Sequence, residues 1–116
     1  MATKNIDTKP LIKALLWAGI EDYCPLWQAV WEINTLIPDL PEQDRLDITR
    51  MLVRSLLDAR AVNLVWLEGD AVEPIDMHDA QLLINEIQHW AVRASQESQV
   101  CLTTTAEGEK YYQTLA

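Results

Sequence analysis

The chain has 116 residues, of which 49% are hydrophobic. This length and composition predict one folded domain over residues 1–116 and argue against a disordered acidic tail. Three glycines and five prolines leave no low-complexity linker that would divide this domain. The formal net charge of −9 disfavours a surface for nucleic-acid phosphates and favours a basic partner.

Both cysteines, Cys24 and Cys101, are isolated in the sequence, and neither has a histidine at metal-ligand spacing. We expect two buried, reduced thiols. There is no apolar run before Leu11 and no apolar stretch of about 18 residues, so the sequence predicts neither a secretory signal nor a membrane span. We therefore expect a cytoplasmic protein that needs no cofactor.

Two helices are predicted first. Thr8 can cap a helix that ends near Gly19, with its buried face formed by Leu11, Ile12, Leu15 and Leu16. A second helix, from Pro25 to Leu36, has an aliphatic stripe of Leu26, Val30, Ile33 and Ile37. Trp27 and Trp31 lie four residues apart on a second stripe, so we expect this pair in the core, although such pairs also line binding grooves.

A third helix is predicted from Pro41 to Arg60, after a turn bracketed by Pro38 and Pro41. Its acidic first turn suits the helix dipole. We expect its buried stripe to consist of Ile48, Met51, Leu52, Leu56 and Ala59. The opposite face is mixed in sign, which is typical of a solvated, salt-bridged helix surface, and carries Asp47, Arg50, Arg54 and Asp58.

The second half begins with a strand from Val62 to Leu67, followed by a turn at Glu68-Gly69-Asp70. Pro74 predicts an irregular, exposed acidic loop of about eight residues. A fourth helix is then predicted from Asp76, its cap, with an inner face of Ala80, Leu83, Ile84, Ile87, Ala91 and Ala94 and with Trp90 beside it. A short strand at 100–104 and a terminal helix at 107–115 complete the chain.

These elements predict a mainly helical α+β fold, with four to five helices packed on a short two-stranded sheet. The sequence leaves the direction of the second strand open. An antiparallel pair and a parallel pair joined by a right-handed crossover are both compatible with the order strand, helix, strand.

Three segments together resemble the winged-helix family: a helix ending in LLDARAV, the strand NLVWL, and a later strand running into LTTTAEG at 102–108. In that family a helix leads directly into a strand, and a Leu-Thr with a later Gly precedes the terminal helix. The resemblance covers residues 33–112. It implies that the helix from Pro41 to Arg60 occupies the recognition position, with Arg50 and Arg54 as candidates for phosphate or base contacts. The wing position instead holds EGDAVEPIDMHD, which implies a scaffold that does not bind DNA.

Catalytic and metal sites find little support in the sequence. His78 and His89 are too far apart on one predicted helix to share a metal ion. His78 beside Asp76 and Asp79 would place a cation at an unfavourable helix N-terminus, and the acidic run lacks EF-hand spacing. There is no glycine-rich phosphate loop, and a cysteine nucleophile would need a base from elsewhere in the fold. We therefore expect neither an enzyme nor a bound metal.

The acidic window from Ala61 through Val92 contains no Lys or Arg, and its six carboxylates are Glu68, Asp70, Glu73, Asp76, Asp79 and Glu86. One interpretation is a solvated face that keeps the protein in solution. The other is a site for a basic protein partner, made by the first five carboxylates with Trp66 as its aromatic anchor. Tyr111 and Tyr112 are the alternative anchors.

In size, charge and lack of motifs, the chain is similar to the immunity proteins of contact-dependent inhibition, which neutralise nuclease toxins. This similarity implies a small acidic inhibitor that covers a toxin's active site or nucleic-acid channel. Phage-encoded inhibitors are of the same type. The alternative is a winged-helix transcriptional regulator that binds DNA as a dimer and brings onto one surface the arginines Arg45, Arg50, Arg54 and Arg60.

Overall fold

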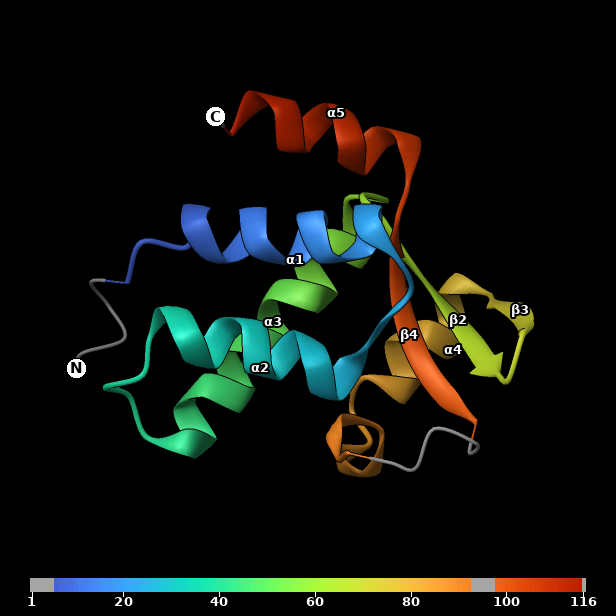
Figure 1. Ribbon diagram of the computed structural model, residues 1–116, viewed down its shortest axis with the longest axis horizontal. Coiled ribbons are helices and arrows are strands. Elements are labelled where there is room, and N and C mark those ends of the chain that lie inside the picture. Colours follow the sequence, from blue (N-terminus) through green and yellow to red (C-terminus); the bar gives the residue numbers. More distant parts are fainter. Residues whose placement is uncertain (1–5, 93–97, 116) are drawn as a thin grey trace.

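The computed structural model describes residues 6–92 and 98–115, which form an α+β fold (Figure 1). The elements in chain order are α1 (Lys9–Glu21), β1 (Cys24–Pro25), α2 (Leu26–Leu36), α3 (Glu42–Asp58), β2 (Val62–Glu68), β3 (Ala71–Ile75), α4 (Met77–Leu83), the 3₁₀ helix η2 (Ile87–Trp90), β4 (Gln99–Thr104) and α5 (Ala106–Thr114). Helices α1, α2 and α3 lie together beside the sheet, and α5 runs along α1. The predicted α+β class is confirmed.

The sheet has four strands in the order β1-β4-β2-β3, and every neighbouring pair is antiparallel. The two predicted strands are β2 and β4, which pair with Leu64 opposite Leu102. Their antiparallel direction excludes the crossover, and the expectation of a two-stranded sheet is wrong because β1 and β3 add an edge on each side. Both edge strands contain a proline. An edge strand tolerates proline because one side of its backbone has no partner strand, but a proline in the sequence argues against predicting a strand.

The segment after β2 is a hairpin, so the expectation of an irregular acidic loop is wrong. The predicted turn is present, because Gly69 and Asp70 join β2 to β3. Gly69 has a φ of 59°, and a positive φ at the first turn residue alone is typical of a type II′ turn, which suits the twist of an antiparallel pair. Pro74 lies within β3, opposite Val65.

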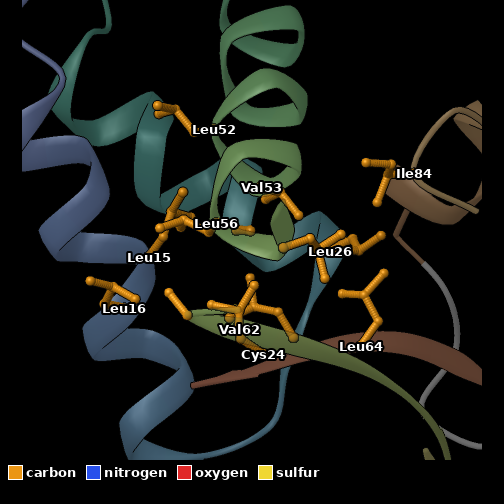
Figure 2. Packing of buried hydrophobic residues seen from close by; sticks show 14 of the residues in the cluster. Leu15, Leu16, Cys24, Leu26, Leu52, Val53, Leu56, Val62, Leu64 and Ile84 are labelled. Carbon is orange, nitrogen blue, oxygen red and sulfur yellow. The ribbon is translucent and has the colours of Figure 1, made fainter. Parts of the chain in front are cut away.

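The core lies between the helices and the sheet face that carries Val62 and Leu64 (Figure 2). The buried stripe of α3 consists of Ile48, Thr49, Leu52, Val53, Leu56 and Leu57. Ile48, Leu52 and Leu56 were therefore predicted correctly, whereas Met51 is 54% exposed and Ala59 is also exposed. The stripe is rotated towards Thr49, whose hydroxyl can be buried because it donates to the carbonyl of Arg45 at 2.7 Å.

Helix α1 continues past Gly19 to Glu21, so the predicted stop at that glycine is wrong, and Thr8 makes no side-chain cap hydrogen bond. Gly19 is needed for close packing instead. A Cβ there would lie 2.5 Å from Oγ1 of Thr104 in β4. The same hydroxyl donates to the carbonyl of Leu16 at 2.7 Å, which fixes α1 against the sheet.

The tryptophan pair of α2 is only partly in the core. The Trp27 side chain is half-buried, and its Nε1 donates to Oε1 of Gln99 at 2.8 Å. Trp31 is 58% exposed, so its expected core position is wrong. The rings meet edge to face with their centroids 5.3 Å apart. Because α2 is apolar on two stripes, its sequence did not show which stripe faces the core.

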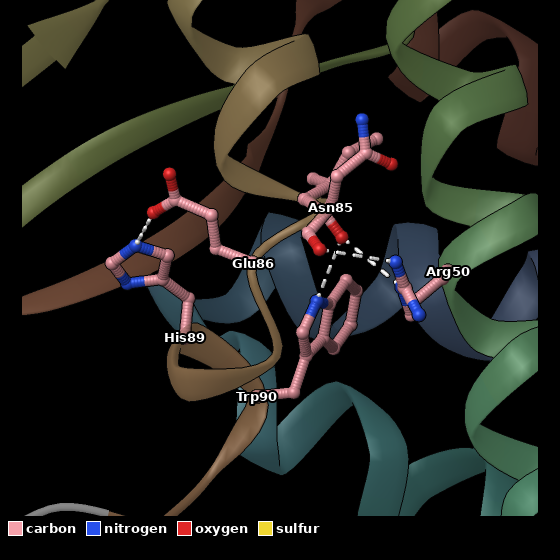
Figure 3. A network of polar contacts seen from close by, with 6 residues as sticks. Arg50, Asn85, Glu86, His89 and Trp90 are labelled. Atoms are coloured by element: carbon pink, nitrogen blue, oxygen red, sulfur yellow. Dashed lines mark hydrogen bonds and ion pairs between the residues drawn. The ribbon is translucent and has the colours of Figure 1, made fainter.

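The prediction of one long fourth helix is also wrong, because α4 ends at Leu83 and the 3₁₀ helix η2 follows after a break. Figure 3 shows the cause: Nε of Arg50 and Nε1 of Trp90 donate to the carbonyl of Ile84 at 3.1 and 3.0 Å. Arg50 also donates to the carbonyl of Asn85 at 3.3 Å. Side chains therefore take the acceptors that a continuing helix would use. Ala94 of the predicted inner face lies outside the described residues.

Candidate functional site

The predicted partner-binding carboxylates lie on two consecutive elements, the β2–β3 hairpin and the beginning of α4. Glu68 ends β2, Asp70 lies in the turn, and Glu73 lies in β3 opposite Trp66. Asp76 precedes α4 and Asp79 lies in its first turn. All five are exposed, and we call them, with Trp66, the acidic surface.

Trp66 forms the floor between two hollows in the acidic surface. One, of about 400 Å³, lies towards α4 and is lined among others by Glu73, Asp76, Asp79 and Glu86. The other, of about 420 Å³, lies towards the hairpin turn and is lined by Trp66, Glu68, Ala71, Glu73 and Ser98. The indole is half-buried and packs edge to face on the ring of His89, with centroids 5.7 Å apart. An anchor held in this way loses little conformational freedom on binding.

Some carboxylates of this region already have partners in the chain. Oδ1 of Asp76 accepts a hydrogen bond from the backbone N–H of Asp79 at 2.9 Å, which caps α4 as predicted. Oε2 of Glu68 accepts from the hydroxyl of Ser98. An oxygen of Glu86 lies 2.8 Å from Nε2 of His89, and no other acid and base among the described residues lie within salt-bridge distance. No described lysine or arginine forms an ion pair with the acidic surface, although Arg60 lines a further hollow together with Asp76.

Glu86 is the residue that sequence reasoning left out of the site. It was counted in the acidic window, but the fourth helix was expected to carry it past the loop. The break after Leu83 turns it back, so that it lines the same hollow as Asp76. A pattern of helical spacing contains no signal for such a turn.

The alternative aromatic anchors lie elsewhere. Tyr111 and Tyr112 belong to α5, which packs against α1. Tyr112 stacks on Trp17 with ring centroids 5.7 Å apart, and neither tyrosine lines the two hollows. Trp66 is therefore the aromatic side chain that the fold joins to the predicted carboxylates.

The arginines of the predicted recognition position are held by the chain itself. Arg50 donates to the carbonyls of Ile84 and Asn85, and Arg54 donates to Oδ1 of Asn85. Arg45 donates to the carbonyls of Pro38 and Leu40 at 2.9 and 2.7 Å. These guanidinium groups fasten the segment after α4 and the turn before α3.

The two cysteines are free and buried, as expected. Burial raises the pKa of Cys24 to about 12, with smaller contributions from the charges of Glu32 and Cys101. Burial, assisted by the charge of Asp22, raises the pKa of Cys101 to about 11. Both side chains are therefore neutral thiols near pH 7, in the form that is poorly nucleophilic.

No protein-family model, curated protein or solved structure matches this chain. Within residues 6–92 and 98–115, no three His, Cys, Asp or Glu side chains are arranged to hold a metal ion. None of the described helices is both long and apolar enough to cross a bilayer. The acidic surface presents exposed carboxylates beside the half-buried indole of Trp66.

Proposed function

We propose that this chain is a small acidic inhibitor that binds a basic protein, of the kind formed by immunity proteins against nuclease toxins. The acidic surface would cover the partner's active site or nucleic-acid channel and take the positions of substrate phosphates. Dense negative charge would also raise the rate of association with such a partner.

The observation that carries the proposal is that no described lysine or arginine lines the two hollows beside Trp66. Four of the five exposed carboxylates line the hollows beside the half-buried indole of Trp66, and the fifth, Asp70, lies in the hairpin turn. A central aromatic anchor within a charged rim is the usual anatomy of a strong protein interface. An ordinary solvated face needs neither the anchor nor the hollows beside it.

We further propose that the scaffold is related to the winged-helix arrangement. Helix α3 leads directly into β2, β4 pairs antiparallel with β2, and Leu102 to Gly108 leads into α5. The 30 residues from Gly69 to Ser98 are then an insertion where a wing would be. The regulator alternative is weakened, because Arg50 and Arg54 donate hydrogen bonds to this insertion.

The test uses the protein encoded beside this chain, purified as a candidate toxin, and measures its nuclease activity and its binding. We expect stoichiometric inhibition by the wild-type protein, with an association rate that falls as salt rises. Neutralising the surface with Glu68→Gln, Asp70→Asn, Glu73→Gln, Asp76→Asn and Asp79→Asn should abolish inhibition. Asp76→Asn keeps an oxygen acceptor for the cap of α4, so the variant should fold.

The matched control removes the same number of charges from exposed sites outside the acidic surface, with Glu21→Gln, Asp39→Asn, Asp47→Asn, Glu107→Gln and Glu109→Gln. It should inhibit like the wild type. A complex that survives neutralisation of the acidic surface and is insensitive to salt would refute the mechanism.

A further inference from the structure

A second recognition site lies away from the acidic surface, in a groove of about 580 Å³ between α2, the first turns of α3 and η2. Trp27, Trp31 and Trp90 line it together with aliphatic side chains that include Leu46 and Ile87. Ile87 is 62% exposed, as a side chain on the rim of an open groove would be. Three of the five tryptophans of the chain therefore meet in one place.

Two of the three indole rings, those of Trp27 and Trp90, are held by hydrogen bonds within the chain. Trp27 and Trp31 stand at 75° to one another, so that they form two walls of a corner. Nε1 of Trp27 is held by Gln99, and Nε1 of the buried Trp90 is held by the carbonyl of Ile84, whereas Trp31 is 58% exposed and offers the most accessible ring. The faces of indoles attract cations more strongly than other aromatic faces do.

The polar atoms that line the groove are suited to accept hydrogen bonds. Oδ1 of Asn34 is buried and has no hydrogen-bond partner among residues 6–92 and 98–115. The carboxylate of Glu42 also lines the groove, and the amide nitrogen of the neighbouring Gln43 is occupied by Asp47 at 2.9 Å. Among residues 6–92 and 98–115, no lysine or arginine lines the groove. Glu42 and Asp44 in the first turn of α3 outweigh the positive half-charge of the helix dipole.

We propose that this groove binds an arginine side chain presented by a protein partner. The planar guanidinium would stack on the indole faces and donate to Asn34 and Glu42, while its aliphatic stem would cover Leu46 and Ile87. An apolar side chain would leave the buried Asn34 oxygen without a donor, which costs free energy. Lysine lacks a planar group that can stack on an indole face.

The site is independent of the proposed inhibitor function, because it shares no residue with the acidic surface. N-acetyl-arginine amide is the probe, and N-acetyl-citrulline amide is its neutral analogue of nearly equal shape. Binding is followed by NMR through the tryptophan indole N–H signals. We expect a Kd on the order of 1 mM for the arginine probe, with shifts at Trp27 and Trp31, and much weaker binding of the citrulline analogue.

Variants locate the binding. Trp31→Ala should raise the Kd about fivefold or more, and Glu42→Gln about two- to fivefold. Trp17→Ala, which removes another exposed tryptophan, and the variant with a neutralised acidic surface should both bind the probe as the wild type does. The proposal fails if the probe does not bind, if citrulline binds equally well, or if Trp17→Ala weakens binding as much as Trp31→Ala. Such a failure would leave the inhibitor test unaffected.

Discussion

Gly108 shows how one residue sets the distance between two elements. It lies in the first turn of α5, where its backbone N–H donates to Oγ1 of the capping Thr105 at 3.0 Å. A Cβ on Gly108 would lie 2.0 Å from the carbonyl oxygen of Ala61, at the beginning of β2. That carbonyl is itself fixed, because it accepts from the backbone N–H of Thr105 at 3.0 Å. The glycine quoted for the winged-helix resemblance therefore lies within the terminal helix and permits its close approach to β2.

Gly108→Ala should consequently destabilise the protein, although alanine is the better helix former. The higher helix propensity of alanine would stabilise the protein by about 1 kcal/mol. Overpacking costs about 1–3 kcal/mol, and more where the added atom clashes with backbone. We expect a net loss of about 2 kcal/mol in the free energy of unfolding, measured by urea denaturation. Gly69→Ala is the matched control, since it meets no atom within 4 Å and strains only its positive φ. Equal midpoints for the two variants would contradict this account.

At the scale of elements, the sequence predicted best where local signals agree with the packing. The bounds of α3 and β2 fall within two residues of the prediction, because prolines, caps and an uninterrupted apolar pattern mark them. The interior of α3 was partly wrong, since Met51 lies on the boundary of an apolar stripe and only the position of the sheet decides which boundary is buried. The strand β3 was missed because an edge position, which no local pattern shows, is what tolerates Pro74.

The candidate site depends on a long-range contact that the sequence does not show. Arg50 of α3 and Trp90 of η2 both donate to the carbonyl of Ile84, which lies 34 residues from Arg50 in the chain. Trp90 is only 6% exposed, so its indole stabilises the turn after α4 from the buried side. The carboxylates themselves were predictable, because exposed charge follows from composition. Their arrangement around Trp66 was not, because the hairpin and this turn create it.

Arg50→Ala should therefore loosen the segment after α4 without unfolding the rest of the core. It removes two hydrogen bonds from a charged donor, and we expect a loss of about 1.5–3 kcal/mol in the free energy of unfolding. Hydrogen exchange should accelerate in α4 and η2 more than in β2 and β4. Met51→Ala, at the neighbouring exposed position of α3, should change both measurements little. Uniform acceleration in Arg50→Ala would show that the contact is not a local brace.

The whole molecule separates its charges, and the separation bears on which partner it takes. Residues 61–92 carry six carboxylates and no lysine or arginine. Three arginines of α3 donate to backbone or side-chain oxygens of the same chain: Arg45, Arg50 and Arg54. A DNA-binding surface needs cations that are free to displace counterions from phosphate. The hydrogen bonds that Arg45, Arg50 and Arg54 donate within the chain oppose such a role for these three arginines.

The protein should accordingly fail to bind duplex DNA even at about 50 mM salt, where non-specific electrostatic binding is strong. Fluorescence anisotropy of a labelled duplex measures this for the wild type and for the variant with a neutralised acidic surface. We expect no binding by either protein, because removing carboxylates does not release the arginines from Ile84 and Asn85. A salt-sensitive binding curve that disappears on joint substitution of Arg50→Ala and Arg54→Ala would favour the regulator instead. In that case the hydrogen bonds from Arg50 and Arg54 to Ile84 and Asn85 would have to break when DNA binds. The rate of hydrogen exchange in η2 would then be higher in the DNA complex than in the free protein.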